Sequence, residues 1–282
     1  MIITSENYHS KEANQEYMSV SSFKDFNGTY GRPACEACGL AKLKGEWVEE
    51  PSTALMVGSF VDSFWDRSLE KFKKENPQIY TKGSKNVEPT LRSDYKQAEL
   101  IIERTLKDKK FCQYMSGEKQ KIMTGELFGC MWKIKIDSYH ENQCIVDLKV
   151  MQSIYDSKWV RDIGHIDFIR YWNYDIQGAV YVEIEYINQL LKCKTQEEMD
   201  RCKRLPFFLA VATKSDHPQI RLIQIPQDWL DDALSIVEAN LPRILKIKSG
   251  EILPDRCEQC DYCNDTYEID KPISAMDLLE GY

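Results

Sequence analysis

The chain has 282 residues, with 43% hydrophobic and 29% charged side chains, which is an ordinary composition for a globular protein. Its formal net charge of −8 argues against a protein that coats DNA through charge alone, because such proteins are usually basic. A local basic cluster or a bound metal ion can still hold a nucleic-acid backbone at one groove. The charge therefore leaves nucleic-acid enzymes open and disfavours tight binding without metal.

The sequence contains no run of about 18 apolar residues, so we expect no membrane-spanning segment. The N-terminal stretch MIITSENYHSKEANQ lacks the basic region and apolar core of a secretory signal. We therefore expect a cytoplasmic protein. Residues 1–18 are polar and are expected to be loosely held.

Apolar residues that recur every three to four positions predict helices at 19–26, 52–72, 94–107, 174–191 and 227–248. A helix or helical turn is expected at 156–163, and a short helix at 271–282. Pro242 should kink the helix that contains it. A continuous apolar run at 206–213 predicts a buried strand, and the alternating stretch 219–225 should pair with it.

The stretch 125–149 reads as two amphipathic strands joined by a polar turn. A turn near residues 140–142 would place position 137 opposite position 145. Asp137 and Asp147 then become diagonal neighbours, with Cβ atoms about 7 Å apart or less. Lys133, Lys135 and Lys149 share their face. Two carboxylates so close would repel each other, and a divalent ion between them would remove that conflict.

Two other helices carry polar residues beside their apolar stripes. In helix 52–72, Asp62 borders the apolar face, where it is either a boundary residue facing water or an inward-pointing ligand. In helix 174–191, Tyr174, Gln177 and Tyr181 line one stripe. An ordinary amphipathic helix with aromatic packing would have the same pattern.

The order of these elements resembles that of the PD-(D/E)XK nuclease superfamily. A helix comes first, then a strand that ends in an acid, then a strand with Asp147-Leu148-Lys149, and then a helix with tyrosines and a glutamine. The resemblance is to its RecB-type branch, and within it to the phage exonuclease VIII (RecE-like) domain. It implies an α/β (α+β) fold with a restriction-endonuclease-like core, in which helices flank a central mixed β-sheet. It covers roughly residues 19–265, giving a single nuclease domain between a polar segment, 1–18, and a tail, 266–282.

The resemblance implies that Asp137 is the first acid of the motif, Asp147 the second and Lys149 its lysine. The backbone carbonyl of Leu148 would be a further metal ligand. Asp62 stands where the family usually has a histidine, so whether it replaces that ligand stays open. A carboxylate suits Mg²⁺ or Mn²⁺, which prefer oxygen ligands. Tyr174, Gln177 and Tyr181 match the helix that is thought to orient DNA or support the site in the family.

Ten cysteines are many for a chain in a reducing compartment, where clustered cysteines indicate metal rather than disulfides. Some RecB-type nucleases resemble this chain here too, with one cysteine before the nuclease core and three after it. That layout implies a [4Fe–4S] cluster on Cys35, Cys257, Cys260 and Cys263. Spacing alone also allows zinc on Cys35, Cys38, Cys257 and Cys260, or free thiols without metal.

Together these features predict a Mg²⁺-dependent DNA exonuclease of phage or prophage recombination type, acting at duplex ends. Carboxylate-held Mg²⁺ would neutralise the scissile phosphate and activate water, and Lys149 would hold or activate that water or stabilise developing charge. A single-strand annealing protein is an expected partner. Two alternatives remain: a DNA-end-binding accessory protein that has lost catalysis, and an endonuclease with the same site.

Overall fold

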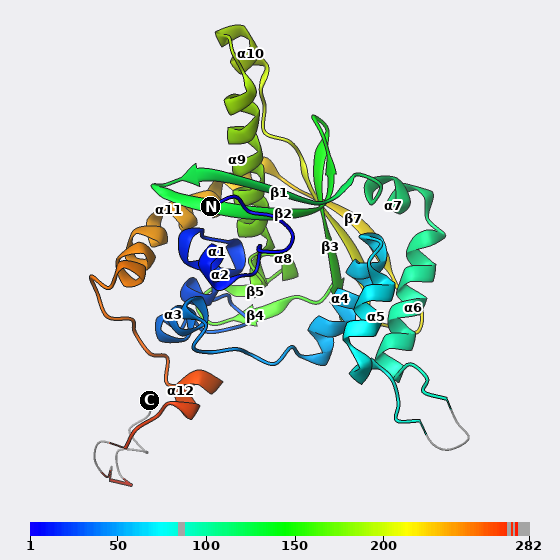
Figure 1. Cartoon of the computed structure of the whole chain (residues 1–282), viewed down its shortest axis with the longest axis horizontal. Helices are drawn as coiled ribbons and strands as arrows, with labels where there is room; N and C mark the ends of the chain where they lie inside the picture. Colours follow the sequence, from blue (N-terminus) through cyan, green and yellow to red (C-terminus); the bar gives the residue numbers. More distant parts are fainter. Residues whose placement is uncertain (84–87, 270–271, 273, 276–282) are drawn as a thin grey trace.

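A computed structural model describes residues 1–83, 88–269, 272 and 274–275. The predicted fold class is confirmed: helices flank a five-stranded mixed sheet (Figure 1). The strands in sheet order are β1 (Glu118–Leu127), β2 (Cys130–His140), β3 (Cys144–Met151), β6 (Phe207–Thr213) and β7 (Ile220–Ile225). β3 and β6 run parallel, whereas the other neighbouring pairs are antiparallel. The crossover between β3 and β6 contains the helices that complete the site.

Strand β6 explains why the sheet is covered on both faces. Its side chains alternate between two apolar cores: Phe207, Leu209 and Val211 pack into one, and Ala210 and Ala212 into the other. Successive side chains of a strand point to opposite faces, so a strand buried on both sides reads as a continuous apolar run. The prediction of a buried strand paired with its successor is confirmed.

Helices from distant parts of the chain cover each face. The first core is closed by α2 (Val20–Asn27), α9 (Tyr174–Lys192) and α11 (Gln227–Ser249), and the second by α4 (Thr53–Trp65), α6 (Ser93–Leu106) and α7 (Lys109–Tyr114). Figure 1 shows α4 to α7 gathered on one side of the molecule, and α1 to α3 with α11 on the other. The smaller elements are α1 (Lys11–Glu16), α3 (Glu36–Lys44), α5 (Leu69–Glu75), the 3-10 turn η1 (Pro77–Ile79), β4 (Lys158–Val160), β5 (Gly164–Ile166), α8 (Phe168–Tyr171), α10 (Gln196–Arg201) and α12 (Asp261–Asp265).

Helix α9 lies close to the sheet because of a glycine. A Cβ atom at Gly178 would come within 2.8 Å of both the Phe207 side chain on β6 and the Leu230 side chain on α11. Such distances are too short for a real contact, so only glycine allows this approach. The neighbouring residue, Gln177, is thereby brought to the edge of β3.

Several predicted helices are confirmed as α2, α6, α9 and α11, within one or two residues at their ends. The predicted helix 52–72 is wrong in one respect, because it is two helices. α4 ends at Trp65 and α5 begins at Leu69, with Arg67 between them in the left-handed region (φ +67°). The apolar pattern runs through the break because both helices pack on the same core. Pro242 lies inside α11, which continues to Ser249.

The helical turn expected at 156–163 is wrong. These residues form most of a two-stranded hairpin, in which β4 pairs with β5. Positive φ angles at Asp162 (+66°) and Gly164 (+92°) reverse the chain there, which a helix cannot accommodate. Strand β1 was also absent from the prediction, although it pairs with β2 along its whole length.

The N-terminal segment is firmly packed, contrary to expectation. Tyr8, Ala13 and Met18 are buried, and Met18 forms a parallel bridge with Trp132 of β2. Lys133 donates a hydrogen bond to Asn14 Oδ1 (2.6 Å) and is 1% exposed, so it does not join the acidic face as predicted. Because residues 1–18 are mostly polar, their composition does not reveal these buried contacts.

The short helix expected at 271–282 falls largely outside the described residues. Within residues 1–83 and 88–269, together with the described positions of the tail, no helix has both the length and the apolarity needed to cross a membrane.

Candidate active site

The site lies where β2 and β3 separate. The two strands pair at Ser138↔Val146, Tyr139↔Ile145 and His140↔Cys144. Continuing the same register by one position puts Asp137 directly opposite Asp147. The predicted register was wrong by two residues, because the turn occupies 141–143 rather than 140–142. A shift of two leaves every side chain on its face, so the two acids still meet.

Asp137 takes the place of the missing strand pairing. The backbone N–H of Leu148 donates a hydrogen bond to Asp137 Oδ2 (2.8 Å). In a continuing ladder this region of β3 would bond to the backbone of β2. The side chain therefore satisfies a backbone donor at the fork and is fixed beside Asp147.

A cavity of about 650 Å³ opens in front of this fork. Each of the predicted nuclease residues lines it, from α4, the two strands and α9: Asp62, Asp137, Asp147, Leu148, Lys149, Tyr174, Gln177 and Tyr181. The structure thus brings together three regions that are far apart in the sequence: α4, the β2–β3 hairpin and α9.

Asp147 is the most enclosed of the acids, at 2% exposed. Its Oδ1 accepts a hydrogen bond from Gln177 Nε2 (2.6 Å), and its Oδ2 forms an ion pair with Lys149 Nζ. Apart from this ion pair, Asp147 Oδ2 has no hydrogen-bond partner among the described residues. Lys149 Nζ also lies 4.9 Å from the centre of the Tyr174 ring. Tyr181 donates to the Lys135 carbonyl (3.1 Å) and so ties α9 to β2.

The carboxyl groups are crowded electrostatically. Burial, followed by the negative charges of Asp147 and Asp62, raises the pKa of Asp137 well above its usual value. Burial, with the charges of Asp66 and Asp147, raises the pKa of Asp62 to about 6. A divalent cation would relieve this repulsion, and carboxylates with a backbone carbonyl are the oxygen ligands that Mg²⁺ and Mn²⁺ prefer. The residues present therefore fit such an ion.

Lys149 keeps its charge in this setting. Burial alone would lower its pKa, but the charges of Asp147, Tyr174 and Asp137 outweigh burial and raise it above the usual lysine value. The side chain is therefore an ammonium group across the ordinary pH range.

Other residues of the cavity have no signal in the sequence. Tyr8 and His9 come from the N-terminal segment, Trp172 from the end of α8, and Lys214 from the residue after β6. Lys214 donates to the Ala54 carbonyl at the start of α4 (2.9 Å). Because these residues arrive from separate segments, only the tertiary fold could have revealed them.

A model of the "PDDEXK-like domain of unknown function (DUF3799)" matches residues 19–266. The chain belongs to this PDDEXK-like family. The family named from the sequence is thereby confirmed at the level of the PD-(D/E)XK fold. The chain is also similar to a crystal structure of a "Putative exonuclease" from Eubacterium rectale, with 55% identity over 100% of both chains and a TM-score of 0.90. No curated protein matches significantly.

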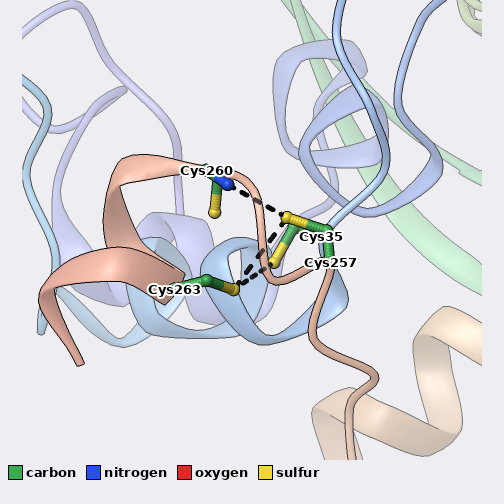
Figure 2. Close-up of side chains that lie close together, drawn as sticks. All are labelled: Cys35, Cys257, Cys260 and Cys263. Carbon is green, nitrogen blue, oxygen red and sulfur yellow. Dashed lines mark hydrogen bonds between the residues drawn. The ribbon is translucent and has the colours of Figure 1, made fainter. Parts of the chain in front are cut away.

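This PDDEXK-like chain has a second group of ligand atoms, where its two ends meet. Figure 2 shows the side chains of Cys35, Cys257, Cys260 and Cys263 pointing toward one another. Their sulfur atoms all lie within 4.8 Å of each other. Cys35 caps the start of α3, Cys257 and Cys260 precede α12, and Cys263 lies within α12.

The set of four matches the layout expected for the iron–sulfur cluster, and Cys38 of the alternative zinc set does not belong to it. Instead, the N–H of Cys38 donates to Cys35 Sγ (3.4 Å). Burial raises the pKa of Cys35 to about 12. At Cys257 burial acts in the same direction, but the N–H groups of Gln259 and Cys260 outweigh it and lower the pKa to about 7.

Polar contacts also hold the two chain ends together beside these sulfurs. The Arg243 guanidinium on α11 bonds Glu36 Oε2 (2.8 Å) and Asp255 Oδ2 (2.8 Å). The Ala37 N–H donates to the Asp255 carbonyl (3.0 Å). The C-terminal segment is therefore anchored to the start of α3 at Asp255, two residues before Cys257.

Proposed function

We propose that this chain is a divalent-metal-dependent deoxyribonuclease that hydrolyses phosphodiester bonds at the ends of duplex DNA. The observation that carries the proposal is the cavity in which Asp62, Asp137, Asp147 and Lys149 converge. The printed description of the Eubacterium rectale relative as a "Putative exonuclease" supports the same activity. The nuclease domain would comprise residues 19–265, in a cytoplasmic protein.

Asp137, Asp147 and the Leu148 carbonyl would hold Mg²⁺ or Mn²⁺, with Asp62 as the ligand that replaces the usual histidine. Such an ion, when bound, supplies charge neutralisation at the scissile phosphate and acidity to a bound water. Gln177 orients the Asp147 carboxylate by its hydrogen bond to Oδ1, which leaves Oδ2 directed at Lys149. Outer partners of this kind fix the direction of a ligand's lone pairs.

Lys149 would act as a cation and not as a base. Its raised pKa keeps the ammonium protonated, so it can donate hydrogen bonds to a phosphate oxygen or to the attacking water. Stabilising charge that develops in the transition state is a large catalytic contribution in a water-poor site. Tyr174 keeps the ammonium in position through its ring face.

We infer a role in recombination of the phage type, with linear duplex DNA as the substrate and a single-strand annealing protein as a partner. This part of the proposal rests on the resemblance to RecE-like exonucleases. A nuclease that resects one strand produces the single strand that such a protein binds.

We further propose that Cys35, Cys257, Cys260 and Cys263 hold one tetrahedral metal ion, with zinc as the best fit. Zinc–sulfur bonds of about 2.3 Å put neighbouring sulfurs about 3.8 Å apart. The separations of Cys263 Sγ from Cys35 Sγ (3.6 Å) and Cys257 Sγ (3.9 Å) agree with that value. A [4Fe–4S] cluster, with each thiolate on a different iron, needs a wider cage and fits these distances less well.

Metal content per chain tests the choice between zinc and iron. We expect about one zinc per chain in protein purified without added metal, and no visible absorption. About four iron atoms per chain with a brown colour would establish the cluster instead.

The activity is tested by incubating linear duplex DNA with the protein and Mg²⁺. We expect digestion that stops with a chelator and is lost in Asp147→Ala. Unchanged digestion by Asp147→Ala would contradict the assignment of the active site. Binding of DNA ends without any digestion would favour the accessory-protein alternative, and cutting of covalently closed circular DNA would favour the endonuclease.

A further inference from the structure

The β4–β5 hairpin and the segment 152–157 before it present large apolar side chains to solvent close to the candidate active site. Tyr155 is 67% exposed, Trp159 is 65% exposed and Ile163 is 53% exposed. Rings of this size normally bury most of their surface or contact a partner. The hairpin follows β3, the strand of Asp147 and Lys149, after the short segment 152–157. In Figure 1 it is the light-green pair next to the lower end of β3.

A second cavity joins the hairpin to the active site. It has a volume of about 480 Å³ and includes Gln152, Ser153, Asp156 and Lys158 in its wall. The two cavities have five wall residues in common: Ala54, Val150, Trp172, Tyr174 and Lys214. The two cavities therefore border each other along these residues.

Trp172 stands at the junction of the two cavities and is 40% exposed. Its backbone carbonyl accepts a hydrogen bond from Lys24 Nζ (2.8 Å). Its ring packs so tightly against Gly31 that a Cβ atom there would lie 2.5 Å from it. The indole is thus held in place with one part of its surface free, as a stacking platform requires.

Cations lie in the wall of the second cavity and beside the exposed ring of Tyr155. Lys214 belongs to both cavities and Lys158 to the second. Arg221 Nε donates to the Tyr155 hydroxyl (2.9 Å), and its guanidinium lies 5.6 Å from the centre of that ring. Asp94 and Asp156 are the acids in the wall of the second cavity, so the charges there are mixed and not uniformly negative.

We propose that the second cavity and the β4–β5 hairpin bind a single-stranded segment of DNA that is continuous with the strand at the acids. Trp172, Tyr155 and Trp159 stack on its bases, while Lys214 and Lys158 contact its phosphates. Aromatic faces bind unstacked bases of any sequence, whereas a duplex keeps its bases stacked and exposes mainly phosphates. This assignment deepens the proposed nuclease function and rests on it.

The test is equilibrium binding of a labelled oligothymidylate to the full chain, by fluorescence anisotropy in a chelator so that no cleavage occurs. Trp159→Ala should weaken binding about tenfold or more, since base stacking on an aromatic residue commonly contributes that much. Tyr155→Phe keeps the ring and should bind within about twofold of the original chain. The matched control is Leu191→Ala, because Leu191 is 75% exposed at the far end of α9.

The inference is overturned if the original chain does not bind oligothymidylate, or if Trp159→Ala and Leu191→Ala bind equally well. Weakening that extends equally to a blunt duplex would also overturn it. The nuclease proposal fails separately, if a chain that binds through Trp159 digests no DNA with Mg²⁺. Conversely, if Trp159→Ala binds oligothymidylate normally and still digests DNA, the proposed hairpin subsite is refuted and the nuclease proposal stands.

Discussion

The two groups of ligand atoms in this protein differ in chemistry and in how the fold assembles them. The acid site offers hard oxygen ligands at a fork between neighbouring strands, where Asp137 and Asp147 lie opposite each other. The cysteine site offers soft sulfur ligands and joins Cys35 to Cys263, which are 228 residues apart in the sequence. Oxygen ligands favour Mg²⁺ or Mn²⁺, and thiolates favour zinc or iron.

The sites also differ in what holds them when metal is absent. The sheet and the two apolar cores fix the acids, although burial and then mutual repulsion raise the pKa of Asp137 and Asp62. Around the cysteines the apolar cluster is small, and α12 has only five residues. We conclude that the fold stabilises the acid site at an electrostatic cost, whereas metal at the cysteine site would stabilise the fold.

The largest expected effect is on catalysis, and Asp137→Asn should produce it. Its amide oxygen can still accept the Leu148 N–H, but the charge needed to hold a divalent ion is lost. We expect cleavage of linear duplex DNA to fall on the order of 100- to 1000-fold, the range for losing one electrostatic group. Thermal stability in a chelator should stay the same or rise, because a buried, repelled carboxylate is removed. A strong fall in the melting temperature would show that the acid site is structural.

Cys263→Ser should produce the opposite result. Loss of one sulfur ligand should cost a few kcal/mol of stability, which corresponds to a fall in Tm of roughly 6–12 °C in a chain of this size. Cleavage per folded molecule should remain within about threefold, since Cys263 lies in the group at the chain ends and not in the cavity of the acids. Calorimetry and limited proteolysis of the C-terminal segment measure the first effect. Cys112→Ser, at a half-buried thiol outside the group, is the control.

The contrast also explains how far the sequence could predict this molecule. Asp137, Asp147 and Lys149 follow a two-residue period on adjacent strands. The prediction that they share a face therefore remained correct, although the predicted register was wrong by two residues. The thiols of Cys257, Cys260 and Cys263 were suggested by their short spacing. Spacing alone left Cys35 and Cys38 open as the N-terminal partner, whereas the family resemblance named Cys35, and the structure groups Cys35 with the other three.

The parts of the prediction that were wrong depended on tertiary contacts. Met18 and Tyr8 are anchored by β2 and its neighbours, which a polar composition does not reveal. The β4–β5 hairpin buries little of its surface, so its aromatic residues carry no inward pattern that distinguishes a strand from a helix. The break at Arg67 changes backbone conformation at one residue inside a continuous apolar pattern.

Gln177→Ala tests whether cleavage depends on the orientation of the Asp147 carboxylate. Removing the donor to Asp147 Oδ1 frees the carboxylate to rotate, without removing its charge. We expect cleavage to fall about 10- to 100-fold, as for loss of an outer partner of a metal ligand, and a higher Mg²⁺ concentration to be needed for half-maximal activity. Gln189→Ala is the matched control, because Gln189 makes the same kind of bond to Glu185 Oε2 further along α9. Equal losses in both variants would mean that α9 is merely destabilised.

The smallest expected effect concerns the pH dependence of stability at Asp62. Its pKa is about 6 in the folded protein, above the value of about 3.9 in an unfolded chain. Between these two values the folded state binds more protons than the unfolded state, so the stability of metal-free protein should fall as pH rises from about 4 to 6. Asp62→Asn should remove most of this dependence.

The difference in Tm between Asp62→Asn and the original chain, measured in a chelator, should therefore increase from pH 4 to pH 6 and then level off. The corresponding difference in the free energy of unfolding should be on the order of 2 kcal/mol or less, given a pKa shift of about two units and the neighbouring charges. With saturating Mg²⁺ the sign should reverse above pH 6, because the ion stabilises the ionised carboxylate of the original chain. A constant difference at all pH values, with or without Mg²⁺, would mean that Asp62 faces solvent and takes no part in the acid site, unlike Asp137 and Asp147.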